Sequence, residues 1–181
     1  MKSRKLTLCA LFVALITVGT FIRIPIAGSV YTLQFLFTLL AGLILGAKLG
    51  MTAVAVYVLM GLLGVPIFAM GGGLSYLLQP TFGYLFGFIV QAYFCGYFSR
   101  KGGTGEFVHL LAVNLGGMLI VYTIGITWFY VVSNYVIDAP ISAWAALLYC
   151  GILQAPPDIL LCIAAAKLAQ RCRKAGIWLS N

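Results

Sequence analysis

Only one acidic side chain lies inside an apolar stretch of this sequence, and it is the residue best suited to ligand chemistry. Asp158 follows the pair Pro156-Pro157 at the start of an apolar run. An ionisable group at membrane depth is costly and by default indicates a functional site. In a first helical turn the carboxylate is stabilised by the helix N-terminus, so a capping role without a ligand is the alternative. As a ligand contact, it would accept N–H donors.

The other polar candidates lie near the predicted outer ends of apolar runs. Arg23 could bind a ligand carboxylate through its forked guanidinium, or it could extend to lipid headgroups. Amide side chains in or beside apolar runs must find a hydrogen-bond partner, either protein or ligand. Those near the outer ends are the better ligand candidates: Gln79, Asn134 and Gln154.

A glycine-rich stretch, PIFAMGGGLSYLLQPTFGY at 66–84, interrupts the apolar runs. Unpaired backbone groups cost several kcal/mol each in hydrocarbon, so this stretch must be lined by protein. Irregular backbone at membrane depth is tolerated where it lines a cavity, and we therefore expect one wall of a small-molecule site here. A connecting loop is the alternative. Tyr76 and Tyr84 belong to a group of outer aromatic residues that fit an aromatic belt, although some could wall an apolar ring.

The composition defines the setting of these residues. The chain has 181 residues, of which 63% are hydrophobic and 8% charged, and its mean hydropathy is +1.10. Soluble proteins have about a quarter charged residues, so the sequence indicates an integral membrane protein. A spanning helix needs about 20 residues, which allows about six spans in a single domain, 1–181. No phosphate-binding G-x-x-x-x-G-K-[ST] motif is present, so we expect no ATPase module.

The apolar runs predict an all-α protein with six transmembrane helices. We place them at about 6–22, 32–47, 51–65, 81–98, 107–133 and 157–171. The run 141–153 is too short to span and predicts a non-spanning outer helix. The proline pair then ends this helix and starts the next, because proline is well tolerated in a first helical turn. Ten of the eleven Lys and Arg residues, all but Arg23, fall on one side. Both termini are therefore predicted to be cytoplasmic in a multi-pass protein of the cell membrane, and the charge of +8 marks topology rather than nucleic-acid binding.

Two further patterns concern partners and chemistry. Ala10 and Ala14 form a small-x-x-x-small pair on which another helix could pack closely. The five cysteines are scattered without a C-x-x-C pair, and no cluster of metal ligands occurs. No nucleophile has a base placed near it either, so we expect no enzyme, no metal and no cofactor.

Three blocks of sequence carry a family resemblance: TLQFLFTLLAGLILGAKLG, YVLMGLLGVPIFAMGGG and YLLQPTFGYLFGF. Together with the later APPD segment they resemble the BioY family, the biotin-specific S components of energy-coupling factor (ECF) transporters. The resemblance implies a six-helix subunit that captures biotin near the outer surface and topples in the membrane to release it. It implies a transmembrane coupling (T) subunit and two cytoplasmic ATPase subunits as partners, with Ala10 and Ala14 docking on the T subunit. Residues 23–31 would be the lid.

The resemblance also implies roles in biotin binding. Asp158 and Gln79 would meet the polar groups of biotin, with Tyr76 and Tyr84 beside its ring. The family commonly has a Lys three residues after this Asp, whereas this chain has Leu161. Lys167 lies about half a turn off the face of Asp158 and cannot substitute. Arg23 therefore becomes the leading candidate for the biotin carboxylate. Another small vitamin, or a scaffolding role without transport, is the alternative function.

Overall fold

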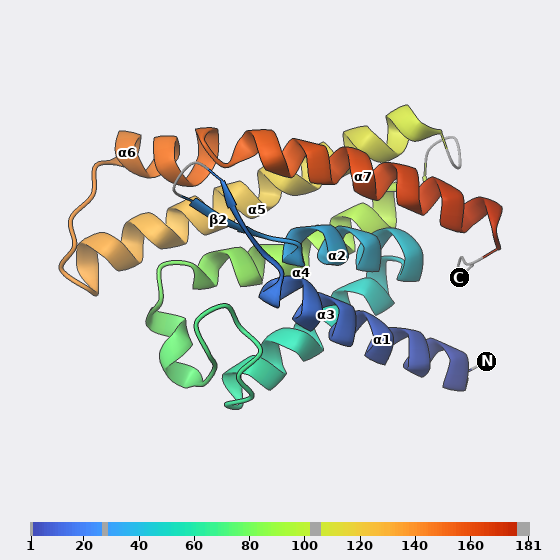
Figure 1. The fold of residues 1–181 in the computed structure, drawn as a ribbon, viewed down its shortest axis with the longest axis horizontal. Coiled ribbons are helices and arrows are strands. Elements are labelled where there is room, and N and C mark those ends of the chain that lie inside the picture. Colours follow the sequence, from blue (N-terminus) through green and yellow to red (C-terminus); the bar gives the residue numbers. More distant parts are fainter. Residues whose placement is uncertain (1, 27–28, 102–105, 177–181) are drawn as a thin grey trace.

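The structure is a computed structural model that describes residues 2–26, 29–101 and 106–176. It is a bundle in which the longest helices run roughly side by side, crossed by one short two-stranded hairpin (Figure 1). The first turn of α1 and the last turn of α7 lie at the same end of the bundle, called the termini end below (Figure 1). The opposite end, called the far end, holds residues 63–81 and 136–142.

The chain begins with helix α1 (Lys2–Phe21) and continues into an antiparallel hairpin of β1 (Arg23–Ile26) and β2 (Ser29–Thr32). Proline cannot supply the amide hydrogen of a helix interior, and the residue before it favours extended backbone. Pro25 therefore explains why α1 does not continue. The helical architecture is confirmed, and this hairpin, at the predicted lid, is its one departure within the described residues.

A sharp reversal joins the next two helices at the termini end. Helix α2 (Gln34–Leu40) runs into a π-helical turn, η1 (Ala41–Leu45), and α3 (Ala47–Leu62) starts after a single residue. That residue, Gly46, has φ +88°, a left-handed conformation that glycine adopts without a steric penalty. The predicted bounds 32–47 and 51–65 are corrected accordingly, because the reversal needs no loop of several residues.

Two helices pass through the middle of the bundle. After the 3-10 turn η2 (Leu74–Leu78), α4 (Phe82–Phe98) packs between α3 and α5 (Phe107–Tyr135). Glycines on α4 allow this close packing, because a Cβ on Gly83 would lie 2.2 Å from Trp128 Cβ and one on Gly87 would lie 3.0 Å from Val121 Cα. The predicted spans 81–98 and 107–133 match these helices to within two residues.

The predicted break before the last helix is a turn of only two residues. Helix α6 (Ala143–Leu147), the π-helical turn η3 (Leu148–Ile152) and α7 (Ala155–Lys174) follow one another with only two residues of turn between η3 and α7. They form one apolar helical segment of 32 residues, long enough to span a membrane. The two prolines occupy the first turn of α7, where no amide hydrogen is needed, so they start the last helix as predicted.

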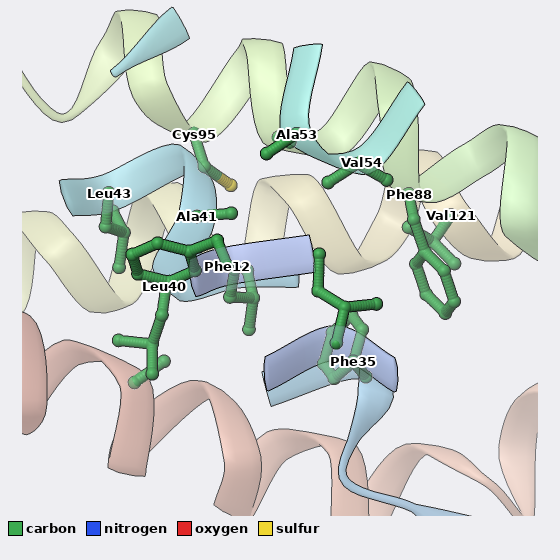
Figure 2. Packing of buried hydrophobic residues seen from close by; sticks show 14 of the residues in the cluster. Phe12, Phe35, Leu40, Ala41, Leu43, Ala53, Val54, Phe88, Cys95 and Val121 are labelled. Atoms are coloured by element: carbon green, nitrogen blue, oxygen red, sulfur yellow. The ribbon is translucent and has the colours of Figure 1, made fainter. Parts of the chain in front are cut away.

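Three helical segments of the described chain are long and apolar enough to cross a membrane: Ser3–Phe21, Phe107–Tyr135 and Ala143–Lys174. Three shorter apolar helices accompany them: Gln34–Leu45, Ala47–Leu62 and Phe82–Phe98. The hydrophobic core joins both groups, and Figure 2 shows Phe12 of α1, Ala53 of α3 and Cys95 of α4 within it. Small side chains dominate where α7 covers the core toward the termini end, since Ala165, Ala166 and Ala169 are fully buried.

Candidate functional site

A cavity of about 430 Å³ lies among α2, α4, α5, α7, the hairpin and the glycine-rich loop. This volume is within the range of small-molecule sites, which are mostly apolar with a few placed polar groups. Its apolar wall comes mainly from α4 and α5, through Leu85, Phe88, Val121 and Phe129. Its polar groups come from the hairpin, α2, the glycine-rich stretch, α4, α5 and α7, so the site exists only in the folded bundle.

Asp158 is the buried charge of this cavity. It lies in the first turn of α7, is 7% exposed and lines the cavity wall. The Tyr122 hydroxyl on α5 donates a hydrogen bond of 2.7 Å to Asp158 Oδ2. Hydrogen bonds to an ionised acceptor are shorter and stronger than neutral ones. The tyrosine therefore fixes one carboxylate oxygen, and the carboxylate retains further lone pairs to accept a ligand donor.

Gln34 contributes a second buried polar group, from the first turn of α2. Its Nε2 donates to the Tyr57 hydroxyl at 3.2 Å, and Tyr57 donates in turn to the Ile67 carbonyl at 2.9 Å. The Thr20 hydroxyl lies 3.0 Å from the same tyrosine oxygen. The Gln34 amide nitrogen is thus used within the protein, whereas its amide oxygen has no hydrogen-bond partner among the described residues. Gln34 can therefore offer an acceptor to a ligand.

Tyr84 forms part of the wall between α4 and α5. Its ring packs on α5 at a glycine, since a Cβ on Gly125 would come within 2.7 Å of the ring. Its hydroxyl donates to the Cys150 carbonyl at 2.9 Å. Cys150 belongs to the π-helical turn η3, and such turns are frequent at functional sites. The ring is therefore held at both ends, which gives the cavity a fixed flat wall.

The mouth of the cavity is formed by the hairpin and the glycine-rich loop. The Arg23 guanidinium on β1 donates a hydrogen bond to the Ala69 carbonyl, and both residues line the cavity. Behind the loop, the Phe68 ring packs against Tyr76 with the ring centroids 4.5 Å apart. Arg23 is exposed whereas Asp158 is buried, so the cation lies at the mouth and the carboxylate lies deeper.

The three consecutive glycines serve the backbone and do not line the cavity themselves. Gly71 and Gly73 have φ values of +111° and +104°, where L side chains are strained. A Cβ on Gly72 would lie 2.3 Å from the Val65 carbonyl oxygen, so this glycine packs against the end of α3. The expected wall comes from the flanking residues, including Ala69 and Tyr76.

The structure brings together most of the candidate residues. The cavity is lined by five of the seven: Arg23, Tyr76, Tyr84, Gln154 and Asp158. Sequence reasoning passed over Gln34, an amide beside an apolar run, in favour of amides nearer the outer ends. It also missed Tyr122, and no local signal could have found it, because its partner Asp158 is 36 residues away on another helix.

Two candidates lie outside the cavity lining. Gln79 is exposed, and its backbone carbonyl accepts a hydrogen bond of 3.3 Å from the Trp128 indole. Asn134 ties the turn after α5, because its side chain donates to the Tyr130 and Ile141 carbonyls and accepts from the Ile141 amide. Ligand contact by these two amides stays a prediction, which this cavity does not favour.

Two other expectations concern surfaces and metals. Ala10 and Ala14 are both exposed on α1, and so are Thr7 and Val18 at helical spacing on the same face. This face does not contribute to the cavity lining. Within the described ranges, no group of three or more His, Cys, Asp or Glu residues is placed to hold a metal ion.

The fold and the cavity define a class: a helical integral membrane protein with a small-molecule site that has a buried carboxylate and a cation at its mouth. The sequence model of the BioY family matches residues 1–177, and the chain belongs to that family.

Named relatives agree with this assignment. A probable biotin transporter BioY of Lysinibacillus sphaericus is 38% identical over 170 residues, covering 93% of this chain and 86% of the relative. The biotin transporter BioY of Thermotoga maritima is 42% identical over 136 residues, covering 75% and 78%. The fold is similar to the crystal structure of the S-component for biotin from an ECF-type ABC transporter, with a TM-score of 0.81 and 26% identity. That match covers 96% of this chain and 92% of the other.

Proposed function

We propose that this chain binds biotin as the S component of an ECF transporter and holds it in the cavity described above. The observation that carries the proposal is the arrangement of polar groups, with buried acceptors at depth and a cation at the mouth. Relatives over most of the chain are named biotin transporters, which supports this choice of ligand.

Biotin has complementary chemistry. Its ureido ring offers two N–H donors and one carbonyl, its thiophane ring is apolar, and its valerate tail ends in a carboxylate. Asp158 and the Gln34 amide oxygen would accept from the ureido N–H groups, because both are buried acceptors. Tyr84 and Phe88 would flank the rings. Arg23 would pair with the carboxylate at the mouth, exchanging its bond to the Ala69 carbonyl for a charged partner.

We further propose six membrane crossings with both termini in the cytoplasm and the cavity opening outward. The basic residues support this topology, since Lys5 lies in the first turn of α1 and Lys174 in the last turn of α7, which meet at the termini end (Figure 1). Arg100 lies against the reversal at Gly46, and Arg173 of α7 donates to the neighbouring Ser99 carbonyl. Helices α3 and α4 have 16 and 17 residues and fall short of about 20. The loop 63–81, which buries Ile67, Phe68 and Tyr76 and exposes Leu63, Met70 and Leu74, would complete their crossings at the far end.

The same proposal includes partners. An S component needs a T subunit and two cytoplasmic ATPase subunits for ATP-driven uptake. The exposed small-residue pair of Ala10 and Ala14 would dock on the T subunit, because small side chains let two membrane helices approach closely.

Equilibrium binding of labelled biotin to the detergent-purified chain tests the ligand. We expect saturable binding that excess unlabelled biotin displaces and that thiamine, another ring-bearing vitamin, leaves unchanged. Absence of binding at micromolar biotin, or displacement by thiamine, would contradict the proposal.

Uptake measurements test the partners. Biotin uptake by cells should require co-expression of the T and ATPase subunits. Ala10→Trp should abolish uptake while sparing biotin binding, because the bulky ring would block helix approach on α1. Ala112→Trp on α5, also exposed, is the matched control and should leave uptake intact. Equal uptake by the Ala10 variant and the control would contradict the docking role.

A further inference from the structure

A second cavity lies on the outer flank of the bundle, where α5 runs beside α6, η3 and α7 (Figure 1). Its volume is about 410 Å³, and we call it the flank groove. One side is a row of α5 residues, including Leu119, Thr123 and Ile126, and the other side includes Leu147 and Ile152. No charged residue lines it.

The groove exists because the π-helical turn has no side chain at Gly151. Gly151 in η3 is buried, and a Cβ at this position would lie 3.1 Å from Ile126 Cδ1. Ala155, at the start of α7, adds only a methyl group to the same wall. Neighbouring positions carry large apolar side chains, so the hollow is local to this turn.

The hydroxyl groups of the groove are already used within the protein. Thr123 donates to the Leu119 carbonyl at 2.8 Å, and Thr127 donates to the Thr123 carbonyl at 2.7 Å. The Tyr122 hydroxyl, at the back, donates to Asp158. The groove therefore has no hydroxyl donor left for a polar ligand, and its chemistry suits a hydrocarbon chain.

The position of the groove identifies the source of that chain. Its α5 residues 118–127 lie near the middle of a 29-residue helix, at the depth of the hydrocarbon core. Its rim is continuous with the membrane-facing surface, since Leu119 and Ile152 are 63% and 50% exposed. We propose that the flank groove binds one acyl chain of a bilayer phospholipid. Leaving it unfilled would deprive its lining of van der Waals partners.

Tyr122 connects this groove to the binding cavity, because it lines both. An acyl chain in the groove packs behind the tyrosine that holds the Asp158 carboxylate. Lipid occupancy therefore supports the position of Asp158 and raises affinity for the cavity ligand. This coupling rests on the proposed function, whereas occupancy of the groove does not.

Native mass spectrometry of the purified protein tests occupancy. The wild type should retain one tightly bound phospholipid after extensive detergent washing. Gly151→Leu and Thr127→Phe fill the groove from opposite sides, and each should lose that lipid. Ala112→Leu, an exposed site on α5 outside the groove, is the control and should retain it. Equal retention by all four proteins would overturn the proposal. So would disulfide capture of a second polypeptide by Leu119→Cys in native membranes, since the groove would then seat a protein helix.

Biotin binding tests the coupling separately. Delipidated wild type should bind biotin severalfold more weakly, and a long-chain phosphatidylglycerol should restore affinity where a six-carbon analogue does not. The biotin affinity of Gly151→Leu and of Thr127→Phe should not change when lipid is removed or added. A wild type that retains its lipid but binds biotin equally well without it would overturn only the coupling. A chain that binds no biotin at all would contradict the proposed function and leave the lipid result standing.

Discussion

The two ends of the bundle are built from the same helices but differ in whether a cavity remains between them. At the termini end, small residues bring backbones into contact: a Cβ on Gly42 would lie 2.5 Å from the Ala92 carbonyl oxygen, and one on Gly96 would lie 2.4 Å from the Ala47 amide nitrogen. Toward the far end, aromatic side chains such as Tyr84 and Tyr122 hold the helices apart through hydrogen-bonded hydroxyls. One bundle thus combines a closely packed termini end with a ligand-sized cavity toward the far end.

The largest loss of stability is expected at the termini end, where the packing leaves no space for an added methyl group. Gly96→Ala should destabilise the protein by about 1–3 kcal/mol, because the new methyl group meets backbone that cannot move aside. Thermal unfolding in detergent measures it. Gly116→Ala is the matched control, since its Cβ meets only the Phe94 ring at 3.1 Å. Equal melting temperatures for the two variants would show that the termini end is not packed as described.

At the hollow end, Asp158→Asn should leave folding intact and weaken binding. The asparagine oxygen can still accept from Tyr122, but the charge that strengthens a ligand N–H bond is lost. Hydrogen bonds to charged groups contribute about 1.5–3 kcal/mol, which corresponds to at least a tenfold loss of biotin affinity. Titration calorimetry measures it, with the exposed Asp138→Asn as control. A variant that binds like the wild type would refute the role of Asp158.

Tyr122→Phe should have a smaller effect through the same carboxylate. It removes the 2.7 Å bond to Asp158 and should weaken biotin binding severalfold. Because the two residues act together, the double variant should bind little worse than Asp158→Asn alone. Tyr130→Phe on the same helix is the control. Fully additive losses in this double-mutant cycle would mean that Tyr122 acts independently of Asp158.

The smallest effect on biotin binding is expected at the mouth of the cavity. Arg23 is exposed, so water screens its attraction for a carboxylate, and Arg23→Ala should weaken biotin binding only severalfold. An analogue whose carboxylate is capped as an amide should bind the variant and the wild type equally. If both ligands lose the same affinity, the arginine holds the loop at Ala69 and does not contact the tail.

The sequence predicted the helices well and the joins between them poorly. The bounds of α4 and α5 follow from apolar runs that end at Arg100 or begin after Glu106. The one-residue reversal at Gly46 and the two-residue turn before α7 depend on tertiary packing, which composition and hydropathy do not report. The hairpin was not predicted either, because strands of four residues are too short to show a clear alternation of apolar and polar residues.

Part of the cavity lining was predictable from the sequence, but the contacts between its residues were not. Asp158 was identified because a carboxylate inside an apolar run is rare, and Arg23 because of its place in the charge pattern. Asn134 looked equivalent from the sequence, yet its amide serves a turn. Whether a polar residue lines the cavity depends on which side of its helix faces the interior of the bundle. Membrane helices are only weakly amphipathic, so the sequence does not show which side that is. The Tyr122 contact required the relative rotation of α5 and α7.

A crystal structure of the chain with biotin bound tests the central claim most directly. We expect the ureido ring beside Tyr84, with a ureido nitrogen within hydrogen-bond distance of the Asp158 carboxylate and the valerate carboxylate near Arg23. Biotin bound outside the cavity, or bound inside it with its carboxylate tail against Asp158, would contradict the account.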